Sequence, residues 1–154
     1  MSSNQSTVVR LAHARDIGFL LKCNQAMADE TEDKGLNPET LEKGITYLLA
    51  HPKEGLYLVA ECNGHACGSL MLTFEWSDWR NGRFWWIQSV YVLPSMRRHG
   101  VYTALHTESI RLAKQDTQAC GIRLYVEKEN INAQQTYYSL GMYETHYQLF
   151  EQLF

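Results

Sequence analysis

The sequence predicts an α+β (α/β) fold in which a mixed, mostly antiparallel, twisted sheet is flanked by about four helices. Two observations lead to it. Three strand-like stretches follow one another in residues 56–92, and residues 84–126 have the order strand, helix, strand. Consecutive strands joined by tight turns are antiparallel, whereas a helical crossover makes its two strands parallel, so the sheet must contain both kinds of pair.

The first third of the chain supplies one strand and two helices. Thr7–Leu11 is expected to be a short strand, and a helix is expected from Asp16, its N-cap, to Met27. A second helix should begin at Pro38, because proline suits the first helical position, and reach Leu49.

The middle of the chain predicts a meander of three strands. Leu56–Glu61 and Ala66–Glu75 are joined by Asn63-Gly64, a strong hairpin signal because both residue types tolerate a positive φ. A longer turn leads into Phe84–Val92, which is rich in aromatic and β-branched residues. This strand should end by Pro94, because proline cannot donate to a sheet ladder.

The last third predicts a helix over Val101–Gln115, a turn closed by Cys120-Gly121 and a strand over Ile122–Val126. A short helix should run from about Ala133 to Leu140. The chain should then end in a strand-rich segment containing Tyr143, Tyr147, Leu149 and Phe150.

Composition narrows the possible functions. A chain of 154 residues, 45% hydrophobic, suits a single domain over residues 1–154, with residues 1–6 as a polar tail. A net charge of -3 argues against nucleic acid and anionic membrane as partners. With no long apolar run and no signal-peptide pattern, the protein is expected in the cytoplasm. The four cysteines lack zinc-ligand spacing, so no metal is expected.

A basic turn stands between the strand Phe84–Val92 and the helix that follows it. Arg97, Arg98, His99 and Gly100 lead directly into this helix, whose first backbone N–H groups and positive dipole end point outward. Such a helix start binds phosphate, and the arginines add charge to it. The alternative is a solvated loop with an ordinary glycine turn.

Two stretches resemble motifs of the GNAT N-acetyltransferase superfamily. Residues 90–105, V-Y-V-L-P-S-M-R-R-H-G-V-Y-T-A-L, resemble its acyl-CoA signature, in which a strand ends in an Arg/Gln-x-x-Gly-x-Gly/Ala turn that holds the CoA pyrophosphate. Arg97 and Gly100 match this turn, whereas Tyr102 replaces the second small residue. Residues 130–142, N-I-N-A-Q-Q-T-Y-Y-S-L-G-M, fit the family's Asn-x-x-Ala-x-x-x-Tyr-x-x-x-Gly-Phe segment, with Met142 in place of phenylalanine.

The resemblance covers nearly the whole chain and implies an acetyl-CoA-dependent N-acetyltransferase with a parallel strand pair that splays apart where CoA enters. It implies that Tyr137 protonates the departing thiolate; the alternatives are that Tyr137 only packs on the sheet, or that its neighbour Tyr138 has this role. The residues implied to bind the acyl donor are Val90, Val92, Arg97, Arg98, His99, Gly100, Val101, Tyr102, Thr103, Asn130 and Tyr137. Asn130 could instead cap a helix.

The acceptor would be a primary amine that attacks the thioester directly in a ternary complex. A carboxylate suits the role of base because amines arrive protonated, and Glu75 is the candidate. Carboxylates and indoles alternate from Glu75 to Trp79, a pattern that attracts cations. The expected acceptor residues are Glu30, Glu32, Trp76 and Asp78, and the expected substrate is a small cationic amine, polyamine- or aminoglycoside-like, or a protein amine.

Two other classes of function remain open at this stage. The chain could be a non-catalytic module that binds or senses acyl-CoA, because Tyr102 departs from the family turn. It could also be an interaction protein whose tryptophans form a dimer surface. A homodimer is possible under every reading.

Overall fold

The structure is a computed structural model that describes residues 6–31 and 35–154. The chain divides into two compact units, Met1–Leu124 and Tyr125–Phe154. The single domain expected from the sequence therefore stays a prediction. None of the helices in the described part of the chain is long and apolar enough to cross a membrane.

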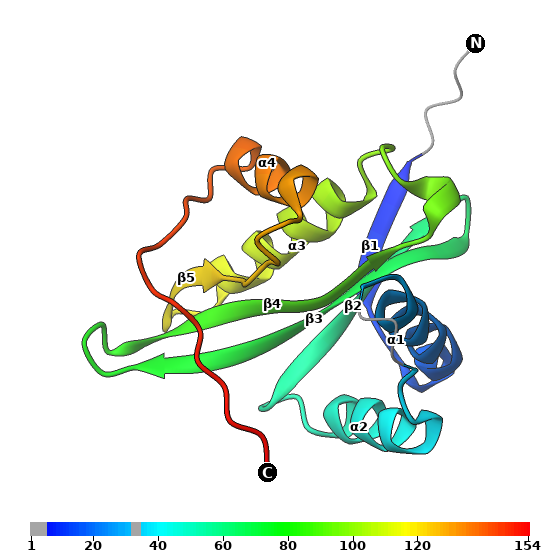
Figure 1. Cartoon of the computed structure of the whole chain (residues 1–154), viewed down its shortest axis with the longest axis horizontal. Helices are drawn as coiled ribbons and strands as arrows, with labels where there is room; N and C mark the ends of the chain where they lie inside the picture. The colour runs from blue at the N-terminus through cyan, green and yellow to red at the C-terminus, as the bar shows by residue number, and fades with distance from the viewer. Residues whose placement is uncertain (1–5, 32–34) are drawn as a thin grey trace. The chain divides into compact units, whose positions relative to one another are not determined.

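The first unit is built on a five-stranded sheet with the strand order β1-β2-β3-β4-β5 (Figure 1). Its strands are β1 (Thr7–Leu11), β2 (Gly55–Cys62), β3 (His65–Ser77), β4 (Gly82–Val92) and β5 (Ala119–Arg123). The first four strands pair antiparallel in chain order, and β5 pairs parallel with β4. The mixed, mostly antiparallel sheet expected from the sequence is confirmed.

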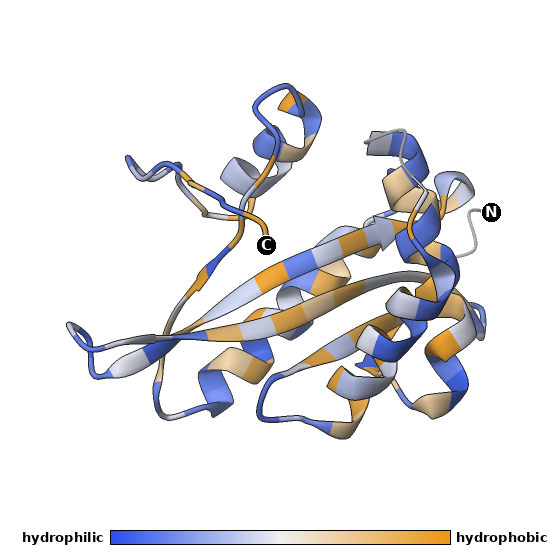
Figure 2. Cartoon of the chain, turned by 60° about the horizontal axis from the view of Figure 1, so that its bottom comes forward, coloured by the Kyte–Doolittle hydropathy of each residue, from blue (hydrophilic) through white to orange (hydrophobic). Residues whose placement is uncertain are grey.

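Helices cover both faces of this sheet (Figure 1). The helices α1 (Ile17–Thr31) and α2 (Pro38–Ala50) lie on one face, and α3 (Val101–Gln115) lies on the other. Alternate residues of β2 face the two layers, as the pleat requires: Val59 packs in the cluster of α1 and α2, and Leu58 in the cluster of α3. Figure 2 shows that the strands of this sheet carry many apolar residues.

Several predicted boundaries are confirmed, and each has a local cause. The bounds of α3 are those expected, because Gly100 takes a left-handed conformation (φ 78°) as its N-cap. Pro38 opens α2, where the Asn37 side chain accepts a hydrogen bond from the backbone N–H of Thr40 at 2.9 Å. Asn63 and Gly64 have φ of 53° and 78°, as a tight hairpin turn requires.

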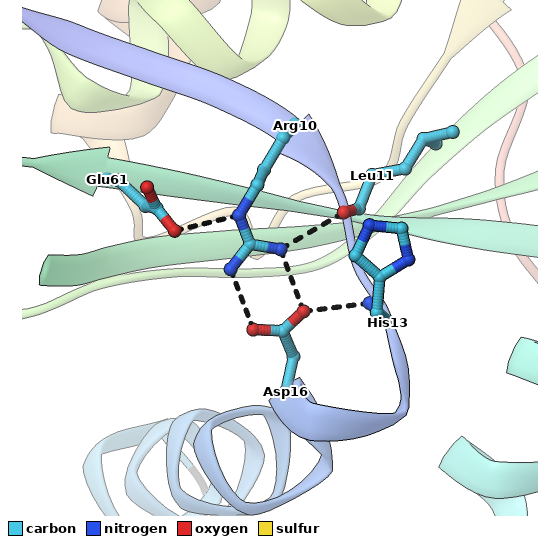
Figure 3. Close-up of polar contacts among 5 residues, drawn as sticks. All are labelled: Arg10, Leu11, His13, Asp16 and Glu61. Carbon is cyan, nitrogen blue, oxygen red and sulfur yellow. Dashed lines mark hydrogen bonds and ion pairs between the residues drawn. The ribbon is translucent and has the colours of Figure 1, made fainter. Parts of the chain in front are cut away.

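The first helix begins directly after Asp16, as predicted, but the capping role of Asp16 and the end of the helix were predicted wrongly. Asp16 ends a 3₁₀ turn, η1 (Ala14–Asp16), instead of serving as N-cap, and α1 continues beyond Met27 to Thr31. The Asp16 carboxylate faces back along the chain and accepts from the backbone N–H of His13 at 2.7 Å (Figure 3). It also accepts two hydrogen bonds from Arg10, at 2.8 and 2.9 Å. The ion pair with β1 thus determines the position of Asp16.

The strand after α3 also begins earlier than predicted. β5 spans Ala119–Arg123, so Cys120 and Gly121 belong to the strand and not to the turn before it. Gly121 is needed there because the Phe84 ring lies against it: an added Cβ would come within 2.9 Å of a ring carbon. The glycine that suggested a turn is therefore explained by packing against β4.

The second unit contains one helix, α4 (Ile131–Ser139), close to the predicted range. Gly141 ends it with φ 91°, and the backbone N–H of Met142 bonds to the carbonyl of Tyr137 at 3.0 Å, which is a Schellman C-cap. The strands predicted after it are absent from the described residues 142–154. A strand needs a neighbour for its backbone hydrogen bonds, and this segment has no ladder partner among the described residues.

Candidate functional site

The second half of β4 has an open edge. β5 pairs with β4 only from Arg83 to Trp86, so no described strand lies beside residues 87–92 on that side (Figure 1). The same stretch bulges against β3, with a register shift opposite Ser69–Met71, and Ser89 takes a positive φ of 50°. The predicted donor residues Val90 and Val92 lie in this stretch, whose edge beyond Trp86 has no strand partner among the described residues.

This open edge leads into the basic turn at the start of α3. Arg98 and Gly100 both have left-handed backbone conformations, with φ of 64° and 78°. Left-handed residues in a turn direct backbone N–H groups into a concave surface that suits an anion. The first bond of α3 joins the Ala104 N–H to the Gly100 carbonyl, so the N–H groups of Val101, Tyr102 and Thr103 precede the helical ladder. The turn expected to bind phosphate therefore has two left-handed residues, followed by three backbone N–H groups at the start of a helix.

The two arginines of the turn have different surroundings. The Arg97 guanidinium forms an ion pair with Glu30 of α1 at 2.9 Å, and its Nε donates to the carbonyl of Val92 at 3.0 Å. The Tyr91 hydroxyl donates to the same Glu30 carboxylate at 2.7 Å. These contacts tie the end of α1 to the end of β4. Arg98 is exposed on the turn, as is Arg97.

The protonation states of Glu30, Tyr91 and Arg97 are mutually stabilising. The hydrogen bond from Tyr91 and the pairing with Arg97 lower the pKa of the Glu30 carboxyl, so it stays ionised. Burial and the neighbouring carboxylate raise the pKa of the Tyr91 hydroxyl, so it stays a proton donor. Glu30 was expected beside the acceptor amine, and the structure brings it to the turn expected to hold the donor. Glu32, expected with it, lies outside the described residues.

Tyr102 replaces the second small residue of the family turn, and its side chain points along its own helix. Its hydroxyl lies 3.1 Å from Nδ1 of His106, one turn further into α3. His106 is buried, and burial lowers the pKa of its imidazole, so the ring stays neutral. The hydroxyl is thus held one turn away from the start of the helix.

The carboxylates and indoles expected to bind the acceptor lie on the β3–β4 hairpin. Glu75 accepts from Arg123 of β5 at 2.8 Å and from the Trp86 indole at 3.3 Å. Asp78 accepts from the backbone N–H of Trp79 at the hairpin turn, at 2.9 Å. Trp76 is 55% exposed, so its indole is not part of the core.

The predicted residues of the second unit are all on or beside α4. Asn130 caps the helix, since its side-chain oxygen accepts from the backbone N–H of Ala133 at 3.2 Å; this is the alternative role that its residue type suggests. Burial raises the pKa of the Tyr137 hydroxyl. Tyr138 is exposed and donates to Glu144 at 3.3 Å. The two neighbouring tyrosines therefore have different environments.

Sequence reasoning missed two parts of this site. Ser89, at the bulge, looks like an ordinary strand residue, because nothing in a pattern of aromatic and β-branched neighbours signals a positive φ. The link from Tyr91 and Arg97 to Glu30 joins residues more than sixty positions apart. A search of residues 6–31 and 35–154 finds no group of three or more His, Cys, Asp or Glu side chains that could hold a metal ion.

Three solved structures are similar to this chain in fold. A possible acetyltransferase from Clostridium difficile 630 is 42% identical, with a TM-score of 0.88, over 96% of this chain and 97% of that one. A predicted acetyltransferase from Clostridium acetobutylicum, solved with acetyl-CoA, is 20% identical with a TM-score of 0.78 over 96% of each chain. An aminoglycoside N-acetyltransferase solved with CoA is 16% identical with a TM-score of 0.78, over 99% of this chain and 98% of that one.

No curated protein sequence matches the chain. The two structures at 20% and 16% identity share the fold, and the first structure is a relative along almost the full length. The model of the acetyltransferase (GNAT) family matches residues 22–142, well over half of the chain. With this match, and with a relative at 42% identity, the chain belongs to the GNAT acetyltransferase family.

Proposed function

We propose that this protein transfers an acetyl group from acetyl-CoA to a primary amine, by direct attack in a ternary complex. The observation that carries the proposal is the continuity of the open β4 edge, residues 87–92, with the anion-binding turn at the start of α3. Beyond Trp86 the edge has no strand partner among the described residues, so an amide-containing arm could pair with it, and the turn offers N–H groups and a cation to a phosphate. Acetyl-CoA contains both groups in this order.

The residues present fit this donor. Val90 and Val92 would offer backbone groups to the pantetheine amides, and Arg97 to Thr103 would surround the pyrophosphate. Arg98 is the exposed cation of the turn and His99 lies beside it, while Arg97 is held by Glu30 and shapes the turn. Two structures that share the fold carry acetyl-CoA or CoA in their crystals, which supports the same class of donor here.

The reaction needs two proton transfers. The neutral amine nitrogen attacks the thioester carbonyl carbon, a C–N bond forms, and the C–S bond then breaks with its electron pair on sulfur. Tyr137 would give its proton to that sulfur, and its raised pKa keeps the hydroxyl protonated at neutral pH. Glu75, directly or through water, would accept the proton that the amine loses. The amide group of Asn130 would bond the pantetheine region while its oxygen caps α4.

The proposed acceptor is a small cationic amine, polyamine- or aminoglycoside-like, or a protein amine. Glu75, Asp78 and Trp76 lie on one hairpin and combine carboxylates with an exposed indole, which favours a cation. The ion pair of Glu75 with Arg123 means that an arriving ammonium group would share this carboxylate. Glu30, in the last turn of α1, would add negative charge, and Glu32 is proposed with it from the sequence alone. We further propose that the protein works in the cytoplasm, where acetyl-CoA is available, and that it is a homodimer.

The second candidate is a module that binds acyl-CoA without turnover. A pure binder would need the turn but no proton donor, and the presence of Tyr137, a half-buried tyrosine at the position that the family resemblance assigns to the proton donor, favours the enzyme. Thiol release from acetyl-CoA separates the two functions when it is measured with a panel of polyamines, aminoglycosides and a lysine-containing peptide. If the protein is an enzyme, thiol release should require both acetyl-CoA and an amine of one class. Saturable binding of acetyl-CoA with no release for any amine would favour the module.

A further inference from the structure

Two arginine side chains lie against one aromatic ring near the start of β4. The guanidinium carbon of Arg123 is 3.6 Å from the centroid of the Phe84 ring, and that of Arg80, in the β3–β4 turn, is 5.0 Å from it. Guanidinium groups stack on aromatic faces and keep the N–H groups at their edges for hydrogen bonds. One buried ring therefore brings two cations close together.

The positive charge of these arginines is only partly balanced. Arg123 pairs with Glu75, whose carboxylate accepts a hydrogen bond from Nη1 at 2.8 Å. In residues 6–31 and 35–154 no carboxylate pairs with Arg80, and Arg123 has no second polar partner. Asp78, the other carboxylate of the hairpin, accepts from a backbone N–H of the turn. Most N–H groups of the two guanidiniums therefore remain available to an anion.

The ion pair of Arg123 lies next to the proposed acetyl-CoA site. Arg123 ends β5 and stands opposite Trp86, the last residue of β4 that pairs with β5. The open edge of residues 87–92 begins directly after this pair. The neighbours Ile122 and Leu124 pack in the cluster of α3, which places Arg123 on the other face of the sheet. Arg123 therefore stands on one face of the sheet, at the point where the edge opens.

We propose that Arg123 and Arg80 bind a carboxylate of the acceptor, and that the acceptor is a small cationic amine that also carries a carboxylate. This inference rests on the proposed acetyl transfer and narrows the class of its acceptor. An ammonium group that shared Glu75 would lie beside a guanidinium group, and like charges repel. A carboxylate on the same molecule offsets this repulsion, because it pairs with the N–H groups of the arginines. A diamino acid is the simplest molecule of this class.

A purely structural role of the two arginines leads to a different expectation. If they only cover Phe84 and neutralise Glu75, their removal should affect every acceptor to the same degree. If they bind a carboxylate, their removal should affect only the acceptors that carry one. Two acceptors that differ in this group therefore separate the two roles.

Lysine and lysinamide form such a pair, since a carboxylate in one is replaced by a neutral amide in the other. Initial rates of thiol release at saturating acetyl-CoA would be measured with each, for the wild type, Arg123→Gln and Arg80→Gln. Arg111→Gln is the matched control, because Arg111 is likewise ion-paired, but on the exposed surface of α3. In the wild type, kcat/KM for lysine should exceed that for lysinamide about tenfold, mainly through KM. Arg123→Gln should abolish this preference, Arg80→Gln should reduce it about threefold, and Arg111→Gln should retain it.

A binding measurement makes the test independent of turnover. In the ¹⁵N-labelled chain, the side-chain Nε–H signals of Arg80 and Arg123 should shift saturably with lysine, and lysinamide should bind about tenfold more weakly. The loss of one signal in each variant assigns them.

Several results would overturn the proposal. They are equal use of both acceptors, a preference that survives in both variants, and arginine signals that do not respond to lysine. Thiol release with polyamines but not with lysine would also overturn it, while leaving acetyl transfer in place. If no amine gives release, acetyl transfer itself fails, and the arginine signals alone decide whether the carboxylate site exists.

Discussion

Replacing Asp16 with asparagine should destabilise the fold more than any substitution at an exposed ion pair. Arg10 makes two parallel hydrogen bonds to the Asp16 carboxylate, at 2.8 and 2.9 Å, and its Nε donates to Glu61 at 2.7 Å (Figure 3). Asp16 is only 6% exposed. Removing one partner of a buried pair costs about 3–5 kcal/mol, but Arg10 keeps Glu61 and is partly exposed. We therefore expect Asp16→Asn to lower the free energy of unfolding by about 2–3 kcal/mol.

Urea denaturation at pH 7 measures this loss, and Glu39→Gln is the matched control. Glu39 pairs with Lys43 at 2.8 Å on the surface of α2, where both side chains are exposed, so its loss should cost about 0.5 kcal/mol or less. If Asp16→Asn cost no more than this control, the assignment of the cluster around Arg10 as a structural link between β1, β2 and η1 would be refuted.

The same cluster predicts a pH dependence with a definite sign. The hydrogen bonds from Arg10 lower the pKa of the Asp16 carboxyl in the folded state, and the His13 N–H lowers it further. The resulting stabilisation is complete above the unfolded pKa of about 3.9 and is lost as the pH falls through the lower, folded value. The difference in stability between wild type and Asp16→Asn should therefore be constant from pH 7 to 5 and shrink below about pH 4.

Three further substitutions test other parts of the account. Arg98→Gly should stabilise the fold by about 1 kcal/mol, because glycine adopts the left-handed conformation of this position without strain. The same change should weaken acetyl-CoA binding about tenfold, because it removes a cation from the phosphate. Calorimetry that shows an unchanged affinity would exclude the Arg98 side chain from the site. Gly121→Ala should cost about 1–3 kcal/mol in thermal or urea unfolding, because its Cβ would press on the Phe84 ring. Tyr137→Phe should reduce turnover about 10²- to 10⁴-fold at saturating acetyl-CoA, with Tyr138→Phe as the mild control; the reverse order would move the proton donor to Tyr138.

The elements with strong local signals could be predicted from the sequence. The hairpin at Asn63-Gly64 and the start of α2 at Pro38 depend on residues whose backbone preferences act within two or three positions. The bounds of α3 could be predicted for the same reason, because Gly100 stands at its N-cap and an amphipathic pattern follows. The turn that carries the candidate site was therefore visible before the structure.

Features that depend on distant residues could not be predicted. Gly121 looks like a turn residue until the Phe84 ring is placed against it, 37 positions earlier in the chain. The ion pair of Arg97 with Glu30 of α1 could not be predicted either, because the two residues are far apart in the sequence. The C-terminal residues have the composition of a strand, yet none forms in the described residues 142–154, because a strand also needs a neighbour for its backbone hydrogen bonds.

The central claim is that the open edge of β4 and the turn at the start of α3 bind acetyl-CoA. The most direct measurement is a titration of the ¹⁵N-labelled chain with acetyl-CoA, followed through its backbone amide signals. We expect saturable shifts of the amide signals. They should be largest for residues 98–103, whose N–H groups would donate to the pyrophosphate, and smaller along residues 87–92. Saturable binding with its largest shifts elsewhere, or no binding at all, would contradict it.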